Sequence, residues 1–195
     1  MIRLPGLVFC VTFGMLAPVA GEPGAGPIPA AATQPADPTF VFSQAVARYV
    51  TLVHRLHGEV PPLRVTAESA EIDNRSNMLA GAIQRARPWA AQGDFFDTNL
   101  VRVIRARLAV ALEGEDLATV MKRIEDDPAP MGPANVYLRF PAGTSLATMP
   151  SRLIEVLPAL PKELEYRFLG RTLILRDRDA AMILDYVPEA LPKAS

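Results

Sequence analysis

The spacing of apolar residues changes once along this chain, and that change constrains its fold more than any other feature. Between residues 39 and 124, apolar side chains recur every three or four positions, which is the period of amphipathic helices. Between residues 135 and 187, they recur mainly at every second position, which is the period of strands with one buried face. We therefore predict an α+β protein in which about four N-terminal helices pack on a small, mainly antiparallel C-terminal sheet.

The helical half is divided by residues that cap or end helices. Thr39, Asp97 and Asp116 precede apolar stripes and are suited to the N-cap position. Gly58 ends the first stripe and Pro88 ends the second, because neither residue type continues a helix well. The predicted helices therefore span Thr39–Gly58, Glu68–Arg87, Asp97–Gly114 and Asp116–Asp127.

A hairpin at Leu164–Arg176 sets the register of the predicted sheet. Gly170 and Arg171 form a two-residue turn with glycine first, so the pairing follows by counting outward from the turn. The facing pairs are Phe168–Leu173, Tyr166–Leu175 and Glu165–Arg176. A register one residue away would lose the apolar pairs and the opposite-charge pair together.

Shorter segments complete the C-terminal half. Residues Asn135–Phe140 alternate between apolar and polar positions and are predicted to form a strand. A short helix is expected from Pro150 to Leu157. A last strand follows the turn at residues 177–179, and its alternating positions on one face are Met182, Leu184 and Tyr186.

Residues 1–21 have the order of a secretory signal peptide. Arg3 supplies a positive charge, an apolar run follows, and small residues end the segment at Gly21. Prolines and glycines interrupt the run, whereas a membrane-spanning helix needs about 20 uninterrupted apolar residues. We expect cleavage to leave a disordered Pro/Ala/Gly-rich leader at residues 22–38, a single α+β domain at residues 39–195, and no stable membrane anchor. The protein is then periplasmic or secreted.

Composition excludes several classes of activity. Cys10 lies inside the signal peptide, so the mature protein has no cysteine and therefore no disulfide, thiolate metal site or cysteine nucleophile. The chain has 20 basic and 21 acidic residues, and loss of Arg3 leaves 19 basic against 21 acidic residues, a net charge of −2. Proteins that bind nucleic acid carry a basic excess, so no nucleic-acid partner is expected.

No catalytic residue, metal site or cofactor is predicted. The chain contains no GxSxG, SxxK, P-loop or GxGxxG motif. His54 and His57 could share a metal with Glu59, but histidines at a helix C-terminus are favoured there by the helix dipole alone. Asp177 and Asp179 could act as paired carboxylates or calcium ligands, but turn-forming aspartates are the simpler explanation.

An aromatic loop between the second and third helices is the first candidate binding surface. Trp89, Phe95 and Phe96 stand there among glycine and polar residues, and aromatic and arginine side chains are the usual anchors of protein interfaces. The alternative is that the rings fill the core between the two helices. The arginines around this loop are Arg85, Arg87, Arg102, Arg105 and Arg107.

The polar face of the sheet is the second candidate surface. Arg139 and Arg167 are the two residues on it that we expect to contact a ligand. Arginines can bind a carboxylate or phosphate through two parallel hydrogen bonds, and a solvated face with weak ion pairs is the alternative. The residues predicted to share this face are Tyr137, Arg139, Glu165, Arg167, Arg176 and Asp185.

These observations favour an exported, soluble, non-catalytic binding or interaction module of the cell envelope. Its expected partner is another envelope protein or a small anionic ligand. The alternative is an exported hydrolase that uses the carboxylates around Asp177 and Asp179 or the His54/His57 pair. A purely structural envelope component is a third possibility, for which a stable oligomer would be the sign.

Overall fold

The computed structural model describes residues 36–62, 68–113, 119–120, 122, 124, 133–140, 144 and 149–193. The chain divides into residues 1–34 and residues 35–195, and every described residue belongs to the second unit. The predicted signal peptide and most of the predicted leader therefore lie outside the described residues. The labelled elements are α1 (Pro38–His57), α2 (Ser69–Ala86), α3 (Thr98–Ala111), α5 (Ser151–Glu155), β1 (Leu164–Leu169), β2 (Thr172–Asp177) and β3 (Met182–Val187).

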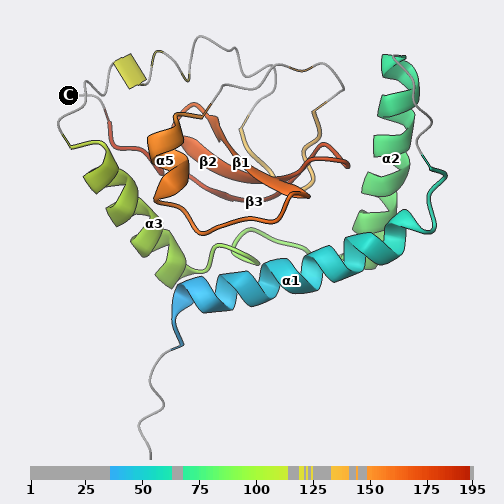
Figure 1. The fold of residues 1–195 in the computed structure, drawn as a ribbon, viewed down its shortest axis with the longest axis horizontal. Helices are drawn as coiled ribbons and strands as arrows, with labels where there is room; N and C mark the ends of the chain where they lie inside the picture. The colour runs from blue at the N-terminus through green and yellow to red at the C-terminus, as the bar shows by residue number, and fades with distance from the viewer. Residues whose placement is uncertain are drawn as a thin grey trace, which may run out of the picture. The chain divides into compact units, whose positions relative to one another are not determined.

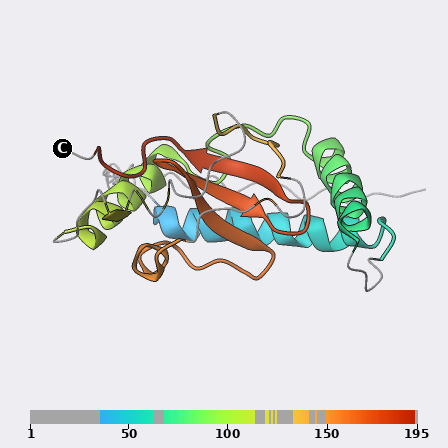
Figure 2. The same ribbon diagram turned by 90° about the horizontal axis from the view of Figure 1, so that it is seen from above.

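The fold is α+β, as the change of apolar period predicts. Helices form the N-terminal half, and an antiparallel sheet in the order β1-β2-β3 forms the C-terminal part. Helix α1 runs beside the sheet, and α2 and α3 contact α1 near its two ends (Figure 1, Figure 2). In the part of the chain that the structure describes, no helix is both long enough and apolar enough to span a membrane.

The helix boundaries follow from capping side chains. Asp37, and not the predicted Thr39, is the N-cap of α1, because the Asp37 carboxylate accepts a hydrogen bond from the Thr39 N–H at 2.9 Å. Pro38 then occupies the first turn, where its missing N–H costs nothing. Asp97 caps α3 as predicted, accepting from the Leu100 N–H at 2.7 Å. Of the predicted fourth helix, residues 119, 120, 122 and 124 are described and helical.

The hairpin of β1 and β2 has the predicted register. Glu165 faces Arg176, Tyr166 faces Leu175 and Phe168 faces Leu173. Gly170 has a φ of +53°, a left-handed value that residues with a side chain adopt only with strain, so a glycine belongs at this first turn position.

Strand β3 departs from the predicted alternation because it contains a bulge. Leu175 pairs with Asp185 while the next residue, Arg176, pairs with Ile183, so Leu184 is an extra residue in β3. Because of this extra residue, the side chains that follow the bulge point to the opposite face of the sheet from the one that regular alternation predicts. Met182 and Leu184 pack in the main core, whereas Tyr186, predicted to share their face, packs on the opposite face of the sheet.

Residues 135–140 do not form the predicted strand. Residues 136 and 137 make a turn in which Tyr137 has a φ of +70°, and this turn interrupts the extended backbone. The segment still lies against β3 through an isolated bridge between Arg139 and Met182. Further backbone bonds from the Tyr137 N–H to Ile183 and from the Phe140 N–H to Ala181 hold it at the edge of the sheet.

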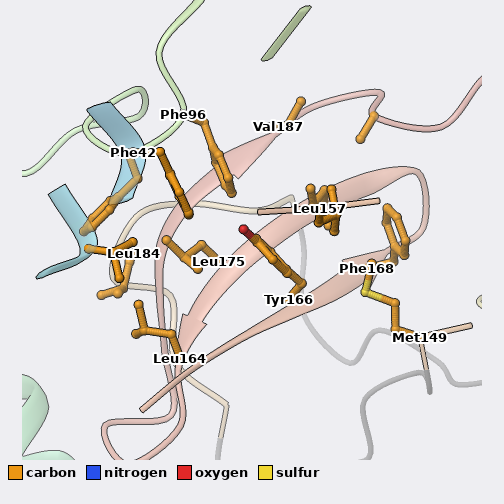
Figure 3. Close-up of a cluster of buried hydrophobic side chains, with 14 of the residues drawn as sticks. Phe42, Phe96, Met149, Leu157, Leu164, Tyr166, Phe168, Leu175, Leu184 and Val187 are labelled. Carbon is orange, nitrogen blue, oxygen red and sulfur yellow. The ribbon is translucent and has the colours of Figure 1, made fainter. Parts of the chain in front are cut away.

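The main core lies between the helices and one face of the sheet. Phe42 of α1 stacks on Phe96 at a ring distance of 5.8 Å, and Phe96 stacks in turn on Tyr166 of β1 at 6.4 Å (Figure 3). The stripe predicted for the first helix is wholly buried in this core. A second, smaller apolar cluster lies on the opposite face of the sheet and contains Phe140, Ile174 and Ile183.

Candidate binding site

The aromatic loop separates its three rings into one exposed side chain and two buried ones. Trp89 is 91% exposed, which is the highest value among the large apolar residues that the structure describes. Phe95 and Phe96 are 5% and 3% exposed and pack in the main core, as the alternative interpretation of the loop predicted. Of the three predicted anchors, Trp89 is therefore the one that a partner can reach.

The turn that carries Trp89 is closed by an ion pair. Asp94 accepts a hydrogen bond from Arg87 Nη2 at 2.8 Å and another from the Ala91 N–H at 3.3 Å. The Arg87 carbonyl accepts from the Ala90 N–H at 3.2 Å and from the hydroxyl of Tyr137 at 2.5 Å. The backbone on both sides of Trp89 is thus tied to the rest of the unit.

Asp185 fastens the other half of the loop. Its carboxylate is fully buried and accepts hydrogen bonds from the N–H groups of Gly93 at 2.9 Å, Phe95 at 2.8 Å and Phe96 at 2.8 Å. Burial raises the pKa of this carboxyl, and the amide hydrogen bonds partly offset that effect. Sequence reasoning placed Asp185 on the polar face of the sheet and missed this role.

Arg87 joins the loop to α1. Its guanidinium lies over the rings of Tyr49 at 5.5 Å and Phe95 at 5.1 Å, within the range of cation–π attraction. A hollow of about 240 Å³ is lined by these residues and by Arg48 of α1. The Arg87 Nη1 atom is buried and has no hydrogen-bond partner, so the guanidinium has an unsatisfied hydrogen-bond donor at this site.

Asp177 is a buried structural carboxylate. It is 1% exposed and accepts hydrogen bonds from the Tyr49 hydroxyl at 2.8 Å and from the Ala180 N–H at 2.7 Å. Burial raises the pKa of Asp177, and its hydrogen bonds partly offset the shift. Burial also raises the pKa of Tyr49. Asp179, in contrast, lies exposed in the following turn, so the two aspartates do not form a pair with a common environment.

The two histidines bind separate partners. His54 Nε2 lies 2.9 Å from Glu163 Oε1, and His57 Nε2 lies 3.4 Å from Asp179 Oδ2. Arg75 Nη2 lies 3.0 Å from His57 Nδ1, so that nitrogen is the acceptor and the proton is on Nε2. The histidine hydrogen bond lowers the pKa of Glu163. Among the described residues, no group of three or more His, Cys, Asp or Glu residues is placed to hold a metal ion.

The predicted polar face of the sheet is divided between two faces. Glu165 and its neighbours Arg167 and Arg176 lie on the face that carries the smaller apolar cluster, where Glu165 binds Arg167 at 2.8 Å and Arg176 at 2.6 Å. Burial by itself raises the pKa of Glu165, but the two arginines outweigh burial and hold the pKa below its ordinary value.

The other members of the predicted patch lie on the core side. Arg139 bridges Met182 of the main core and donates from Nε to the Ala180 carbonyl at 3.2 Å. Tyr137 packs against the main core, and Asp185 binds the aromatic loop. The bulge in β3 turns Asp185 to the core side, and pairing with Met182 places Arg139 on that side, so Arg139 and Arg167 do not converge on one ligand.

Comparisons with protein-family models, with curated proteins and with solved structures give no match to this chain. The function of this protein is therefore inferred from the geometry of the chain itself.

Proposed function

We propose that this protein is an exported, non-catalytic binding module of the cell envelope that contacts another envelope protein through Trp89. The observation that carries the proposal is the 91% exposure of Trp89 on a loop whose backbone is tied down on both sides. Tryptophan is the residue type most enriched among side chains that dominate binding energy, and it contributes a large apolar area.

The fixed backbone of the loop supports the same proposal. A binding loop that is ordered before contact loses less conformational entropy when the partner arrives. Asp94 and Asp185 supply this order through five hydrogen bonds to the loop, from Arg87 Nη2 and from the N–H groups of residues 91, 93, 95 and 96. A buried carboxylate is costly, so the use of Asp185 here indicates that the conformation of the Trp89 loop matters.

The charge around Trp89 favours an acidic partner surface. Arg85 is exposed in the last turn of α2, and Arg48 is exposed and lines the neighbouring hollow. Arg87 is offset by Asp94, so the balance of these residues is positive. Complementary charge of this kind increases the rate of association and rejects basic partners.

The test is chemical cross-linking of the tagged full chain in its native cells, followed by mass spectrometry of what is recovered. Wild-type protein is compared with Trp89→Ala and with Phe40→Ala, which removes another exposed aromatic side chain, on α1. A partner recovered with wild type and Phe40→Ala, and lost with a folded Trp89→Ala, supports the proposal. Recovery of the protein alone, or equal recovery with all three proteins, would contradict it.

Purified protein gives an independent measurement. Trp89 is the only tryptophan in the chain, so its fluorescence reports on this one position. We expect emission typical of a solvated indole and strong quenching by iodide in the free protein. Addition of the recovered partner should shift the emission to shorter wavelength and reduce the quenching.

An exported hydrolase is the second candidate, and one observation favours it. His54, His57, Glu163 and Asp179 line a common hollow of about 460 Å³. Among the described residues, no serine, threonine or cysteine lines the hollow, so the enzyme would use a water molecule activated by a histidine or a carboxylate. Hydrolysis of a panel of ester, peptide and glycoside substrates that is lost in His54→Ala would favour this candidate.

A further inference from the structure

A hollow lies between β1 and the connection that leads into it from α5. Residues 156–163 form this connection and run back along β1 (Figure 1, Figure 2). The Tyr166 hydroxyl donates to the Pro158 carbonyl at 3.0 Å. The Leu164 N–H donates to the Pro161 carbonyl at 3.1 Å. The two walls of the hollow are therefore hydrogen-bonded to each other.

The greater part of the hollow is apolar. Ile154 of α5, Leu157 and Leu160 line one side of it, and Leu164 of β1 lines the other. Ile154 is 45% exposed, so a ligand can enter from solvent on that side. The volume of about 280 Å³ is near the lower end of the range for small-molecule pockets. At about 30 Å³ for each water-sized group, it holds a ligand of about nine non-hydrogen atoms.

The polar end of the hollow carries a guanidinium with an unsatisfied donor. Arg167 and Glu165 both line the hollow, and Arg167 Nη2 bonds the Glu165 carboxylate at 2.8 Å. Arg167 Nε is buried and has no hydrogen-bond partner. The Arg167 side chain is 29% exposed, so it is within reach of a ligand in the hollow. Because an unpaired donor is costly, an acceptor oxygen at this guanidinium is favourable.

The charge next to the hollow favours an anion. Glu165 also accepts a hydrogen bond from Arg176 Nη1 at 2.6 Å, and Arg178 Nε lies 4.0 Å from the same carboxylate. Arg167, Arg176 and Arg178 thus surround one glutamate, which leaves an excess of positive charge. Burial alone raises the pKa of Glu165, but its arginine neighbours hold that pKa below its ordinary value, as expected in a positive field.

We propose that this hollow binds a small amphipathic carboxylate, with the carboxylate on the Arg167 guanidinium and a short apolar tail against Ile154, Leu157 and Leu160. A guanidinium and a carboxylate match in shape and charge, and the tail removes the apolar wall from water. Trp89 is not among the described residues that line the hollow. The site is therefore separate from the contact proposed for Trp89, and either proposal can fail without the other.

The first test is a titration of isotope-labelled protein, purified after expression of the full chain, followed by two-dimensional NMR. Hexanoate is the probe, because its unbranched tail and carboxylate suit the size of the hollow. We expect saturable shifts of the amide signals of residues 154–160 and 164–167, with a dissociation constant of about 1 mM or below. Hexanol has the tail without the charge, and acetate has the charge without the tail. Each should bind at least about tenfold more weakly than hexanoate.

Three results of this titration would overturn the proposal. They are the lack of a saturable hexanoate shift in these residues, binding of hexanol as tight as that of hexanoate, and binding of acetate as tight as that of hexanoate. The second result would show an apolar hollow without selection for charge. The third would show an arginine cluster that binds anions without use of the hollow.

The second test removes the charge at Arg167. Arg167→Gln should raise the dissociation constant of hexanoate at least about tenfold, because a hydrogen bond between charged groups is lost. Arg102→Gln, an exposed change on α3, is the matched control and should bind hexanoate like wild type. Thermal unfolding checks the fold of each variant, since Arg167→Gln also loses the ion pair with Glu165. Wild-type affinity in a folded Arg167→Gln would overturn the proposal.

The third test shortens the apolar wall and does not touch the ion pairs. Ile154→Ala should weaken hexanoate binding at least about threefold, because part of the contact with the tail is lost. Met78→Ala, at a side chain of similar exposure on α2, is the control and should have no effect. Both side chains are partly exposed, so both variants should fold. If Arg167→Gln does not fold, Ile154→Ala and the wild-type titration decide the question. Unchanged hexanoate binding in Ile154→Ala would overturn the proposed position of the tail.

Discussion

Tyr49 on α1 donates its hydroxyl to Asp177 at the end of β2 at 2.8 Å, joining residues 128 positions apart in the chain. The bond connects the helical half to the sheet inside the main core. Replacement of Tyr49 by phenylalanine keeps the ring and leaves a buried acceptor with one partner fewer. We expect Tyr49→Phe to lower the free energy of unfolding by about 1–3 kcal/mol, measured by urea denaturation. Tyr186→Phe, which removes a hydroxyl from the opposite face, is the control and should change stability little.

The contribution of Asp177 to the free energy of unfolding should increase as the pH falls. Burial raises its folded-state pKa above the ordinary value of 3.8, so the folded protein keeps this proton to a higher pH than the unfolded chain. The stability of wild type relative to Asp177→Asn should therefore increase as the pH falls from neutral toward 3.8, and decrease as it rises through the folded-state pKa.

Urea denaturation of wild type and Asp177→Asn at a series of pH values measures this difference. Carboxyls common to both proteins, such as Glu163 and Glu165, cancel in the comparison. A difference that shrinks on acidification would mean that the hydrogen bonds from Tyr49 and Ala180 outweigh burial.

Asp185 should hold the Trp89 loop in place. Asparagine at this position presents an amide donor to the N–H groups of Gly93, Phe95 and Phe96, so at least one of them loses its acceptor. We expect Asp185→Asn to lower the free energy of unfolding by at least about 1–3 kcal/mol and to speed amide exchange in residues 93–96. Asp179→Asn, which changes an exposed carboxylate in the turn between β2 and β3, should change neither the free energy of unfolding nor the amide exchange of residues 93–96.

Gly170 should resist substitution for a conformational reason alone. Its φ of +53° is left-handed, and no atom lies within 4 Å of the position a Cβ would take. Gly170→Ala should therefore destabilise the protein by about 1–2 kcal/mol. The matched control is Gly81→Ala inside α2, where alanine favours the helix and should stabilise by about 0.5–1 kcal/mol. Equal effects of the two changes in thermal unfolding would contradict this account of the turn.

The parts of the fold that depend on local chemistry could be predicted from the sequence. The stripe of α1, the cap at Asp97 and the register around Gly170 each depend on residues close together in the chain. The bulge at Leu184 could not be predicted, because no glycine or proline marks it and the run of apolar residues from Met182 to Leu184 gives no alternation that would reveal an extra residue. The prediction of a strand at residues 135–140 was wrong because the alternation of side chains gives no sign of the left-handed backbone at Tyr137.

The candidate site was predictable in position but not in detail. Composition indicated the aromatic loop, but it could not separate Trp89 from Phe95 and Phe96. Their burial depends on α1 and the sheet, which lie about 40 to 90 residues away in sequence. The role of Asp185 also depends on a contact across 89 to 92 positions. A single carboxylate inside an otherwise apolar strand was the available signal for it.

The central claim is that Trp89 contacts a partner, and site-specific photo-cross-linking tests it most directly. A photoreactive phenylalanine analogue is placed at position 89 in one version of the protein and at position 40, another exposed aromatic site, in a second version. Both are irradiated in the native cells. The account predicts a discrete adduct of higher mass from position 89 that is absent from position 40. No adduct from position 89, or the same adduct from both positions, would contradict it.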